Sequence, residues 1–346
     1  MMIALRKIAK GDGFLELQDI PKPSITADEV LIEVKVTGIC GSDLKIWHDH
    51  HPYWPPVTLG HEFSGEIVEV GKEVKNWSVG DRVVAMPHNG HCGRCALCLG
   101  GNIHICPEKR SIGWGIDGAM AKYLRMPAKL LLRVPESLTY EEAAVAEPLA
   151  VAVNAILLRS RVEPGDFVVI FGPGPIGFLS ALVARAGGAS TVVLVGVERD
   201  AKVRLARAKV AGIDLTVNVE KEANIVERIM DMTHGVGADL VIEASGARSA
   251  IGAGIQMVRR LGRVAALGVS GADNVPVPWD IAMFKACDLK FNFSTTYQSW
   301  DRALRLMGKG AVDVKHVITE VKPLKEWESV FRNLEAGDGI KSMLVP

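Results

Sequence analysis

The chain has 346 residues, which is enough for two domains of ordinary size. Apolar residues make up 48% of it, so the composition predicts a large buried core and excludes a disordered chain. The 40 lysines and arginines are balanced by 40 aspartates and glutamates, which gives no electrostatic reason to expect nucleic acid or an anionic membrane as a partner.

No stretch approaches the roughly 18 apolar residues that are needed to span a bilayer. Residues 1–7 lack the apolar segment of a signal peptide. We therefore expect a soluble, cytoplasmic protein that has no membrane partner.

Residues 1–149 alternate short runs rich in valine and isoleucine with glycine and proline. The runs 29–36 and 66–70 show the period-2 pattern of strands. This region is therefore predicted to form an all-β, barrel-like domain.

Four residues of this domain carry groups that can bind a metal: Cys40, His61, Glu62 and Glu147. A catalytic zinc needs few protein ligands and one exchangeable position, and a mixture of cysteine, histidine and glutamate provides that. A buried cysteine and a structural histidine explain the same residues equally well. The residues alone leave both interpretations open.

A second set is denser, because four cysteines follow the pattern C-x2-C-x2-C-x7-C: Cys92, Cys95, Cys98 and Cys106. In a cytosolic protein such clustering favours a metal over disulfides. Four thiolates on one loop predict a closed, structural zinc site. A nucleic-acid-binding zinc ribbon is disfavoured by the neutral net charge, whereas the spacing does not exclude an iron–sulfur cluster.

From about residue 150 the pattern becomes that of alternating strands and helices. An apolar strand at 167–171 precedes a helix through Ala186, and further strands are expected at 192–195, 239–243 and 262–268. Such alternation predicts an α/β domain with a doubly wound parallel sheet.

The first strand of this domain leads into Gly172-Pro173-Gly174-Pro175-Ile176-Gly177, which fits G-x-G-x-x-G. Between a strand and a helix, the glycines allow a tight turn, close approach of a pyrophosphate and close packing of helix on strand. The loop predicts dinucleotide binding.

The choice between NAD and NADP depends on the end of the next strand. An acidic residue about 20 positions after the loop binds the ribose hydroxyls of NAD. Gly196 lies near that position and Glu198 follows it, whereas Arg199 and Arg204 would suit the 2′-phosphate of NADP. The sequence leaves this choice open.

Beyond residue 296 a helical segment at 300–307 and a short closing segment follow. We predict three divisions of the chain: a catalytic domain at 1–149, a dinucleotide-binding domain at 150–296, and a return to the first domain at 297–346.

These motifs resemble, across essentially the whole chain, the zinc-containing medium-chain alcohol dehydrogenases. The resemblance is carried by Gly60-His61-Glu62-x2-Gly65-x5-Gly71-x2-Val74, the four cysteines, Glu147-Pro148-Leu149 and the glycine loop. It implies a GroES-like β-barrel catalytic domain, a Rossmann domain, one catalytic and one structural zinc per subunit, and a homo-oligomer, with a tetramer favoured over a dimer.

Glu62 and Glu147-Pro148-Leu149 resemble in particular the sorbitol and threonine dehydrogenase branch. The resemblance implies that Cys40, His61 and Glu62 hold the catalytic zinc, with Glu147 as a fourth ligand or as a group that orients water and substrate. It assigns Ser42 to the proton relay and Asp43 to the orientation of His61.

The chain departs from many relatives at Lys45, where they carry a histidine of the proton relay. His48, His50, His51 or water could replace it, or Lys45 itself could act if burial lowered its pKa. The aromatic residues Trp47, Tyr53 and Trp54 are expected to line the substrate cleft.

The sequence thus predicts a zinc-dependent enzyme that transfers hydride between NAD(P) and a small secondary alcohol or ketone, most readily a polyol. L-Threonine 3-dehydrogenase is the nearest alternative, although no pair of groups for a substrate ammonium and carboxylate stands out. A non-catalytic NAD(P)-binding sensor or structural protein is the alternative from another class.

Overall fold

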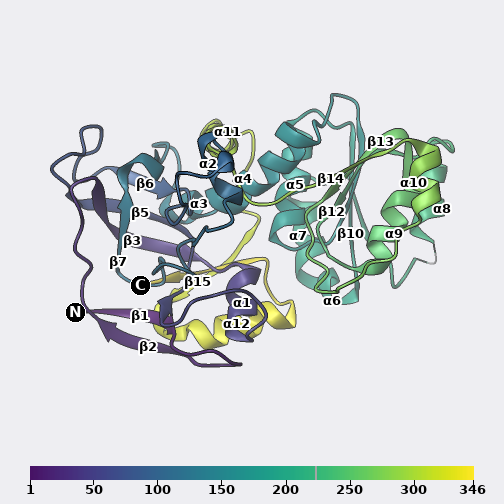
Figure 1. Ribbon diagram of the computed structural model, residues 1–346. Coiled ribbons are helices and arrows are strands. Elements are labelled where there is room, and N and C mark those ends of the chain that lie inside the picture. Colours follow the sequence, from purple (N-terminus) through teal and green to yellow (C-terminus); the bar gives the residue numbers. More distant parts are fainter. Residues whose placement is uncertain (223) are drawn as a thin grey trace. The chain divides into compact units, whose positions relative to one another are not determined.

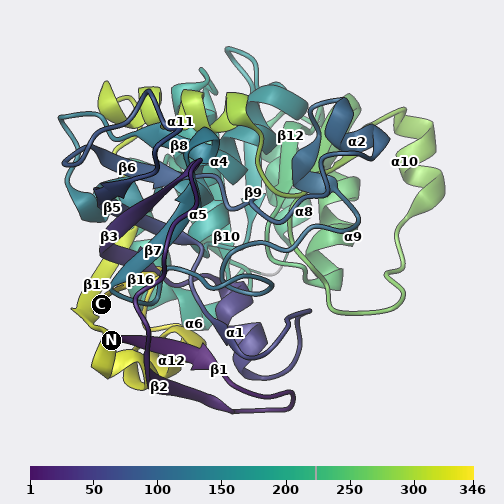
Figure 2. The same ribbon diagram turned by 60° about the vertical axis from the view of Figure 1, so that its left-hand side comes forward.

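The structure is a computed structural model that describes residues 1–222 and 224–346. Contacts within the chain divide it into two units, which Figures 1 and 2 show from two directions. Unit 1 comprises residues 1–147, 295–308 and 318–346, and unit 2 comprises residues 148–294 and 309–317. The segments 295–308 and 318–346 therefore contribute to the same unit as the N-terminal part of the chain.

Unit 1 is built on two sheets (Figure 2). One has the order β2-β1-β4, and the other has the order β15-β16-β3-β5-β6-β8 with β7 paired to β3. Their strands are β1 (Met2–Lys7), β2 (Leu15–Ile20), β3 (Glu29–Gly38), β4 (Val57–Thr58), β5 (Glu62–Val70), β6 (Arg82–Ala85), β7 (Tyr123–Pro127), β8 (Leu131–Arg133), β15 (Ile318–Pro323) and β16 (Lys341–Val345).

The predicted strands at 29–36 and 66–70 are present within β3 and β5. The two strands pair in antiparallel fashion from Val30 with Val70 to Gly38 with Glu62. Alternate residues are buried over 32–36 of β3 and 65–68 of β5, as the period-2 signal indicates, whereas the adjoining ends at 36–38 and 62–65 are buried without alternation. The last residues of β3 are thereby placed beside the first residues of β5.

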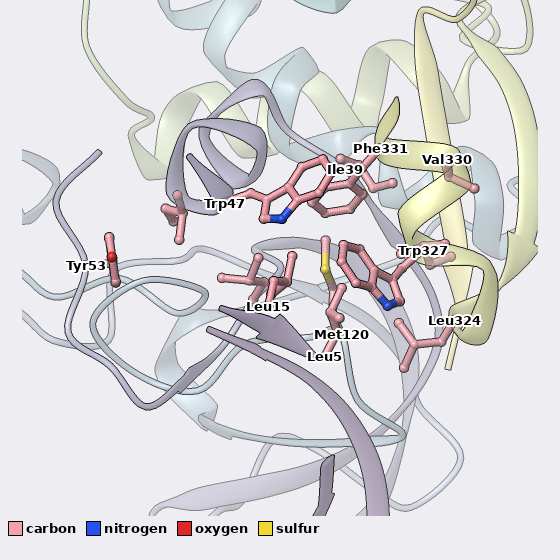
Figure 3. Packing of buried hydrophobic residues seen from close by; sticks show 13 residues of the cluster. Leu5, Leu15, Ile39, Trp47, Tyr53, Met120, Leu324, Trp327, Val330 and Phe331 are labelled. Atoms are coloured by element: carbon pink, nitrogen blue, oxygen red, sulfur yellow. The ribbon is translucent and has the colours of Figure 1, made fainter. Parts of the chain in front are cut away.

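A cluster of buried aromatic side chains packs two helices of unit 1 against each other (Figure 3). Trp47 ends α1 (Gly41–Trp47), whereas Trp327 and Phe331 belong to α12 (Trp327–Ala336). The three rings pack edge to face with centroids 5.5–5.8 Å apart, which is favourable aromatic geometry. The C-terminal helix therefore holds α1 in place.

The same cluster corrects the expectation that Trp47, Tyr53 and Trp54 line a substrate cleft. Trp47 and Tyr53 are buried in the core, because their rings cover apolar neighbours from β1 and α12. Trp54 is 41% exposed, and the guanidinium of Arg110 lies 4.5 Å from its ring centroid.

Unit 2 contains one six-stranded sheet in the order β11-β10-β9-β12-β13-β14, in which every pair is parallel. Figure 1 shows helices on both sides of this sheet. Its strands are β9 (Phe167–Phe171), β10 (Thr191–Gly196), β11 (Leu215–Asn218), β12 (Ala238–Glu243), β13 (Val258–Ala266) and β14 (Asp288–Phe291). Its main helices are α5 (Pro175–Ala186), α7 (Ala206–Val210), α8 (Ile225–Met232), α9 (Arg248–Met257) and α10 (Trp279–Lys285).

The predicted doubly wound parallel sheet is confirmed. Strand β9 has the predicted bounds, and α5 ends at Ala186 as expected, since Gly187 follows there. Strand β13 begins four residues before the predicted start. Among the described residues, no helix combines the length and apolar character required to cross a membrane.

Candidate functional site

The first group of candidate residues meets where β3 ends and β5 begins. Cys40 follows β3 and is the N-cap residue of α1, whereas His61 precedes β5 and Glu62 is its first residue. The register that pairs Gly38 with Glu62 brings the two strand ends together. The sulfur of Cys40, a ring nitrogen of His61 and a carboxylate oxygen of Glu62 lie within 4.8 Å of one another.

Asp43 connects two members of this group. It lies in the first turn of α1, is fully buried, and its Oδ2 accepts a hydrogen bond of 2.8 Å from the backbone N–H of Cys40. Its Oδ1 lies 3.9 Å from Nδ1 of His61 and has no hydrogen-bond partner among the described residues. A carboxylate in this position can orient the imidazole so that Nε2 remains available for a ligand bond.

Glu62 has a partner that the motif analysis did not identify. Lys341, the first residue of β16, donates from Nζ to both carboxylate oxygens, at 2.6 and 2.9 Å, and to the carbonyl oxygen of Ile39 at 2.8 Å. Both side chains of the ion pair are 1% exposed. The one available signal is a lysine within the mainly apolar segment 340–345, because a charge buried in a strand needs a partner.

The electrostatics of the group favour a cation. Burial acts to lower the pKa of His61, but the neighbouring Cys40, Asp43 and Glu147 outweigh it and raise that pKa to about 10. Burial raises the pKa of Glu147 to about 7. Burial also raises the pKa of Asp43. Sites that hold a histidine in its charged form are sites where surrounding negative groups stabilise positive charge.

These residues fit a zinc ion. Sulfur, nitrogen and oxygen ligands are the set that zinc accepts, and three protein ligands leave a position for water or substrate. Glu147 is buried and its charge acts on His61, but it is not part of the set within 4.8 Å. Its predicted role as a fourth ligand or as an orienting group remains a prediction.

The candidates for a proton relay differ in their surroundings. Ser42 is half-buried in the first turn of α1, whereas Lys45 and His50 are exposed, so Lys45 lacks the burial that its proposed tuning requires. His48 is bound on both ring nitrogens by carboxylates, Asp12 at 2.7 Å and Glu335 at 2.7 Å.

The pKa of His51 is lowered, first by burial and also by the charge of His61. The ring of His51 also packs against Trp114, with 4.4 Å between the ring centroids. The titration of His51 thus senses the charge of His61.

The four-cysteine loop also brings together groups that could hold a metal. The four sulfur atoms lie within 4.8 Å of one another, and those of Cys92 and Cys98 are 3.9 Å apart. Tetrahedral zinc with bonds of about 2.3 Å to sulfur separates its sulfur ligands by about 3.8 Å. All six cysteines are free thiols, so this loop contains no disulfide. The geometry fits a closed zinc site.

The glycine loop in unit 2 has the conformation that dinucleotide binding requires. Gly172 has a φ of +92°, and a Cβ at Gly177 would lie 1.8 Å from the carbonyl oxygen of Gly172, so no larger residue fits there. Gly174 is the N-cap of α5 and Pro175 is the first residue of that helix. The free N–H groups at this helix end can bind a phosphate.

A cavity of about 410 Å³ opens at this loop within unit 2 and is lined by Gly172, Gly174, Gly196, Arg199 and Arg204, among others. Glu198 does not line it, because its carboxylate is bound by Asn218 and by Lys221 at 2.8 Å. Asp200 does line the cavity, but its oxygens accept hydrogen bonds from Val197 at 3.1 Å and from Arg204 at 2.9 Å.

Two families match the chain. The alcohol dehydrogenase GroES-like domain matches residues 26–136, and the zinc-binding dehydrogenase domain matches residues 175–309. Both expected types of domain, the GroES-like and the Rossmann-type, are thereby confirmed.

Several relatives match along nearly their entire lengths. A sorbitol dehydrogenase of Halalkalibacterium halodurans is 37% identical, with 100% of this chain and 99% of the relative covered. A D-arabitol-phosphate dehydrogenase of Enterococcus avium is 36% identical, with 99% and 97% covered. The solved alcohol dehydrogenase of Thermus sp. ATN1 is 30% identical with a TM-score of 0.90, and 99% of each chain is covered.

Proposed function

The chain belongs to the zinc-binding alcohol dehydrogenase family, and from that premise we propose that it interconverts a secondary hydroxyl group of a polyol and the corresponding ketone, with NADP as the hydride carrier. The observation that carries the proposal is the buried set of Cys40, His61 and Glu62 in a chain that matches polyol dehydrogenases from end to end. Zinc, when bound, supplies Lewis acidity toward the substrate oxygen, and the nicotinamide supplies the hydride acceptor.

The residues of the site divide the work between them. Cys40, His61 and Glu62 would hold the metal, and Asp43, whose Oδ1 lies 3.9 Å from Nδ1 of His61, would orient the imidazole. Lys341 holds the Glu62 carboxylate in place and balances its charge. Glu147 is a buried acid whose charge acts on His61, and it would orient water or substrate.

Ser42 relays the proton. Its position two residues after Cys40 places its hydroxyl on the turn that carries the candidate metal ligand, where Oγ can take the proton of the substrate hydroxyl as its own hydroxyl proton passes to the next acceptor. We propose that His51 or water receives the proton next, since Lys45 is exposed and His48 is bound by two carboxylates.

Neither alternative to this function is favoured. Two of the three relatives named above are a sorbitol dehydrogenase and a D-arabitol-phosphate dehydrogenase, and none of the three is named as a threonine dehydrogenase. A non-catalytic protein would be expected to lack a ligand or the relay serine, whereas Cys40, Ser42, His61 and Glu62 are all present.

Initial rates with NAD⁺ and NADP⁺ across polyols, polyol phosphates, butanediols and L-threonine test this function. We expect turnover on a polyol or its phosphate. Turnover confined to L-threonine would replace the proposed substrate, and inactivity on every alcohol by a protein that contains zinc and binds cofactor would support the non-catalytic alternative.

Preference for NADP is supported by charge at the end of β10. Gly196 provides no carboxylate for a ribose hydroxyl, Glu198 is held outside the cavity, and Arg199 and Arg204 line it. A protein of Sinorhizobium meliloti, provisionally assigned as a zinc-binding dehydrogenase, was solved with NADP bound. It is 31% identical with a TM-score of 0.93, and 100% of this chain and 99% of that chain are covered.

An Arg199→Gln variant is expected to raise the KM for NADP⁺ by roughly tenfold while changing the KM for NAD⁺ little, because it removes one charge-assisted contact with the 2′-phosphate. Lys202→Gln is the matched control, since Lys202 is equally exposed and does not line the cavity. Equal changes in both KM values, or a wild-type enzyme that prefers NAD⁺, would contradict the assignment.

The predicted homo-oligomer is supported by an apolar surface of unit 2. Strand β14 is an edge strand of the sheet, and six large apolar residues on β14, α10 and the segments after them are 40–72% exposed. They are Trp279, Met283, Phe284, Leu289, Phe291 and Phe293. Unpaired strand edges and apolar surfaces of this kind are covered by partners, and we propose that a second copy of the chain covers this one. A tetramer remains the predicted final state.

Replacing Trp279 and Phe291 together by lysine is expected to reduce the oligomer to a smaller species. The two added charges would have to lose their water when the interface forms, which costs free energy. Light scattering after size-exclusion chromatography gives the mass. Val210→Lys serves as the control, since Val210 is 75% exposed on α7, outside this surface. An unchanged mass in the double variant would rule out this surface as the interface.

A further inference from the structure

A second cavity lies in unit 1 and contains none of the residues of the metal centre. It has a volume of about 420 Å³, which lies within the range of small-molecule sites. Its walls come from β1, the segment after β2, the end of β4, the residues before β7, and β7 itself. Nothing in the proposed reaction uses it.

Two side chains that line this cavity each carry one buried polar atom without a hydrogen-bond partner, although the guanidinium of Arg6 also donates to the carbonyl oxygen of Pro56 at 3.2 Å. Arg6 on β1 and Thr58 on β4 are directly paired across the antiparallel strands, so their side chains lie next to each other on one face. Nε of Arg6 and the hydroxyl of Thr58 are buried, and neither has a hydrogen-bond partner among the described residues. Thr58 is 1% exposed.

Such orphaned atoms are uncommon, because a buried donor without a partner costs about 1–3 kcal/mol. Here the two orphans are adjacent and both belong to residues that line one cavity. A ligand that accepts hydrogen bonds would satisfy them once the two side chains turn toward the cavity, since neither atom is open to it in the present rotamers.

The charged residues that line the cavity indicate which class of hydrogen-bond acceptor would bind there. Three cationic residues line the walls, Arg6, Lys22 and Arg125, against one carboxylate, Asp117. Asp117 is already engaged, because its Oδ1 accepts hydrogen bonds from Arg6 at 3.3 Å and from the backbone N–H of Thr58 at 2.7 Å. The chain as a whole has no net charge, so this local surplus of two positive charges is a property of the cavity.

From this juxtaposition we infer that the cavity binds a small phosphate monoester. A phosphate monoester carries a charge between about −1.5 and −2 at neutral pH, which matches the surplus, and its oxygens accept hydrogen bonds. The apolar wall residues Met2, Ile20 and Leu124, with the ring of Tyr123, can contact the organic part. Arg6 and Thr58 bind the phosphate from the floor, and Lys22 and Arg125 bind it from the rim.

Calorimetric titration of phenyl phosphate into the zinc-loaded enzyme tests the site. The enzyme is saturated with NADP⁺ so that the cofactor already occupies the glycine loop of unit 2 and phenyl phosphate cannot bind there. We expect saturable binding of one molecule per chain, and no binding of phenol. The Lys22→Gln/Arg125→Gln double variant is expected to weaken the affinity at least tenfold while kcat stays unchanged, since both residues are exposed and lie outside the metal centre.

Thr58→Val tests the floor of the cavity separately, and we expect it to weaken phenyl phosphate binding without changing the affinity for NADP⁺. Lys72→Gln is the charge-matched control, because Lys72 is an exposed residue of unit 1 outside the cavity, and we expect no change in it. An undetectable interaction in the wild type, or equal affinity in the wild type and the double variant, would overturn the inference. This result is independent of turnover, so it does not depend on the proposed reaction.

Discussion

A Cys40→Ser variant is expected to lose turnover by more than about 100-fold and to retain one zinc per chain in place of two. Loss of a partner beyond the ligands of a metal already costs about 10–100-fold in affinity or activity, so loss of a thiolate ligand should exceed that. The four-cysteine loop is a separate site, and its zinc should remain. Mass spectrometry measures the zinc content per chain, and kcat measures the loss of turnover.

A second variant distinguishes the loss of a zinc ligand from a general effect of replacing a cysteine by serine. Cys287 is a half-buried cysteine of unit 2 that packs against the core, so Cys287→Ser makes the same chemical change away from the metal centre. We expect Cys287→Ser to keep both zinc ions and its activity, and both variants to bind NADP⁺ with wild-type affinity. If Cys40→Ser kept both zinc ions and turned over within about tenfold of the wild type, Cys40 would not be a ligand.

A Lys341→Met variant is expected to lower the free energy of unfolding of the zinc-free protein by about 3–5 kcal/mol, because it leaves the Glu62 carboxylate buried without a counter-charge. The loss should be smaller in the zinc-loaded protein, where the metal gives Glu62 another cationic partner. Denaturant unfolding of the wild type and the variant, each with and without a chelator, measures both values.

Two further variants isolate the ion pair. Glu62→Gln/Lys341→Met removes both charges and should be less destabilised than Lys341→Met, since no lone charge remains buried. Lys322→Met, at a residue of β15 in the same sheet, breaks an exposed pair with Glu326 and should cost at most about 1 kcal/mol. If Lys341→Met and Lys322→Met had equal effects, the buried pair would not hold Glu62.

The four-cysteine loop and the His61–Glu62 pair could be predicted as candidate metal ligands because the spacing within each is local. The four cysteines lie on one short loop, and His61 and Glu62 are neighbours in a short glycine-flanked motif. The glycine loop could be predicted for the same reason, because the glycines, the preceding apolar strand and the following helix are contiguous.

The direction in which a side chain points could not be predicted from residues that are neighbours in the sequence. Glu198 and Arg199 are adjacent, yet the carboxylate turns to Asn218 and Lys221 while Arg199 lines the cavity. Trp47 and Tyr53 are near the metal ligands in sequence but pack inward, because the C-terminal helix supplies their apolar partners.

The sequence by itself determined the residues whose chemistry depends on neighbours along the chain: the thiolate loop, the His61–Glu62 pair and the phosphate-binding turn. Only the tertiary structure placed Lys341, which is 279 positions from Glu62, against that carboxylate, and only the pairing of β1 with β4 set Arg6 beside Thr58. The physical reason is that a buried charge or donor is satisfied by whatever residue the fold brings within about 3 Å, and strand pairing can bring that residue from any distance along the chain.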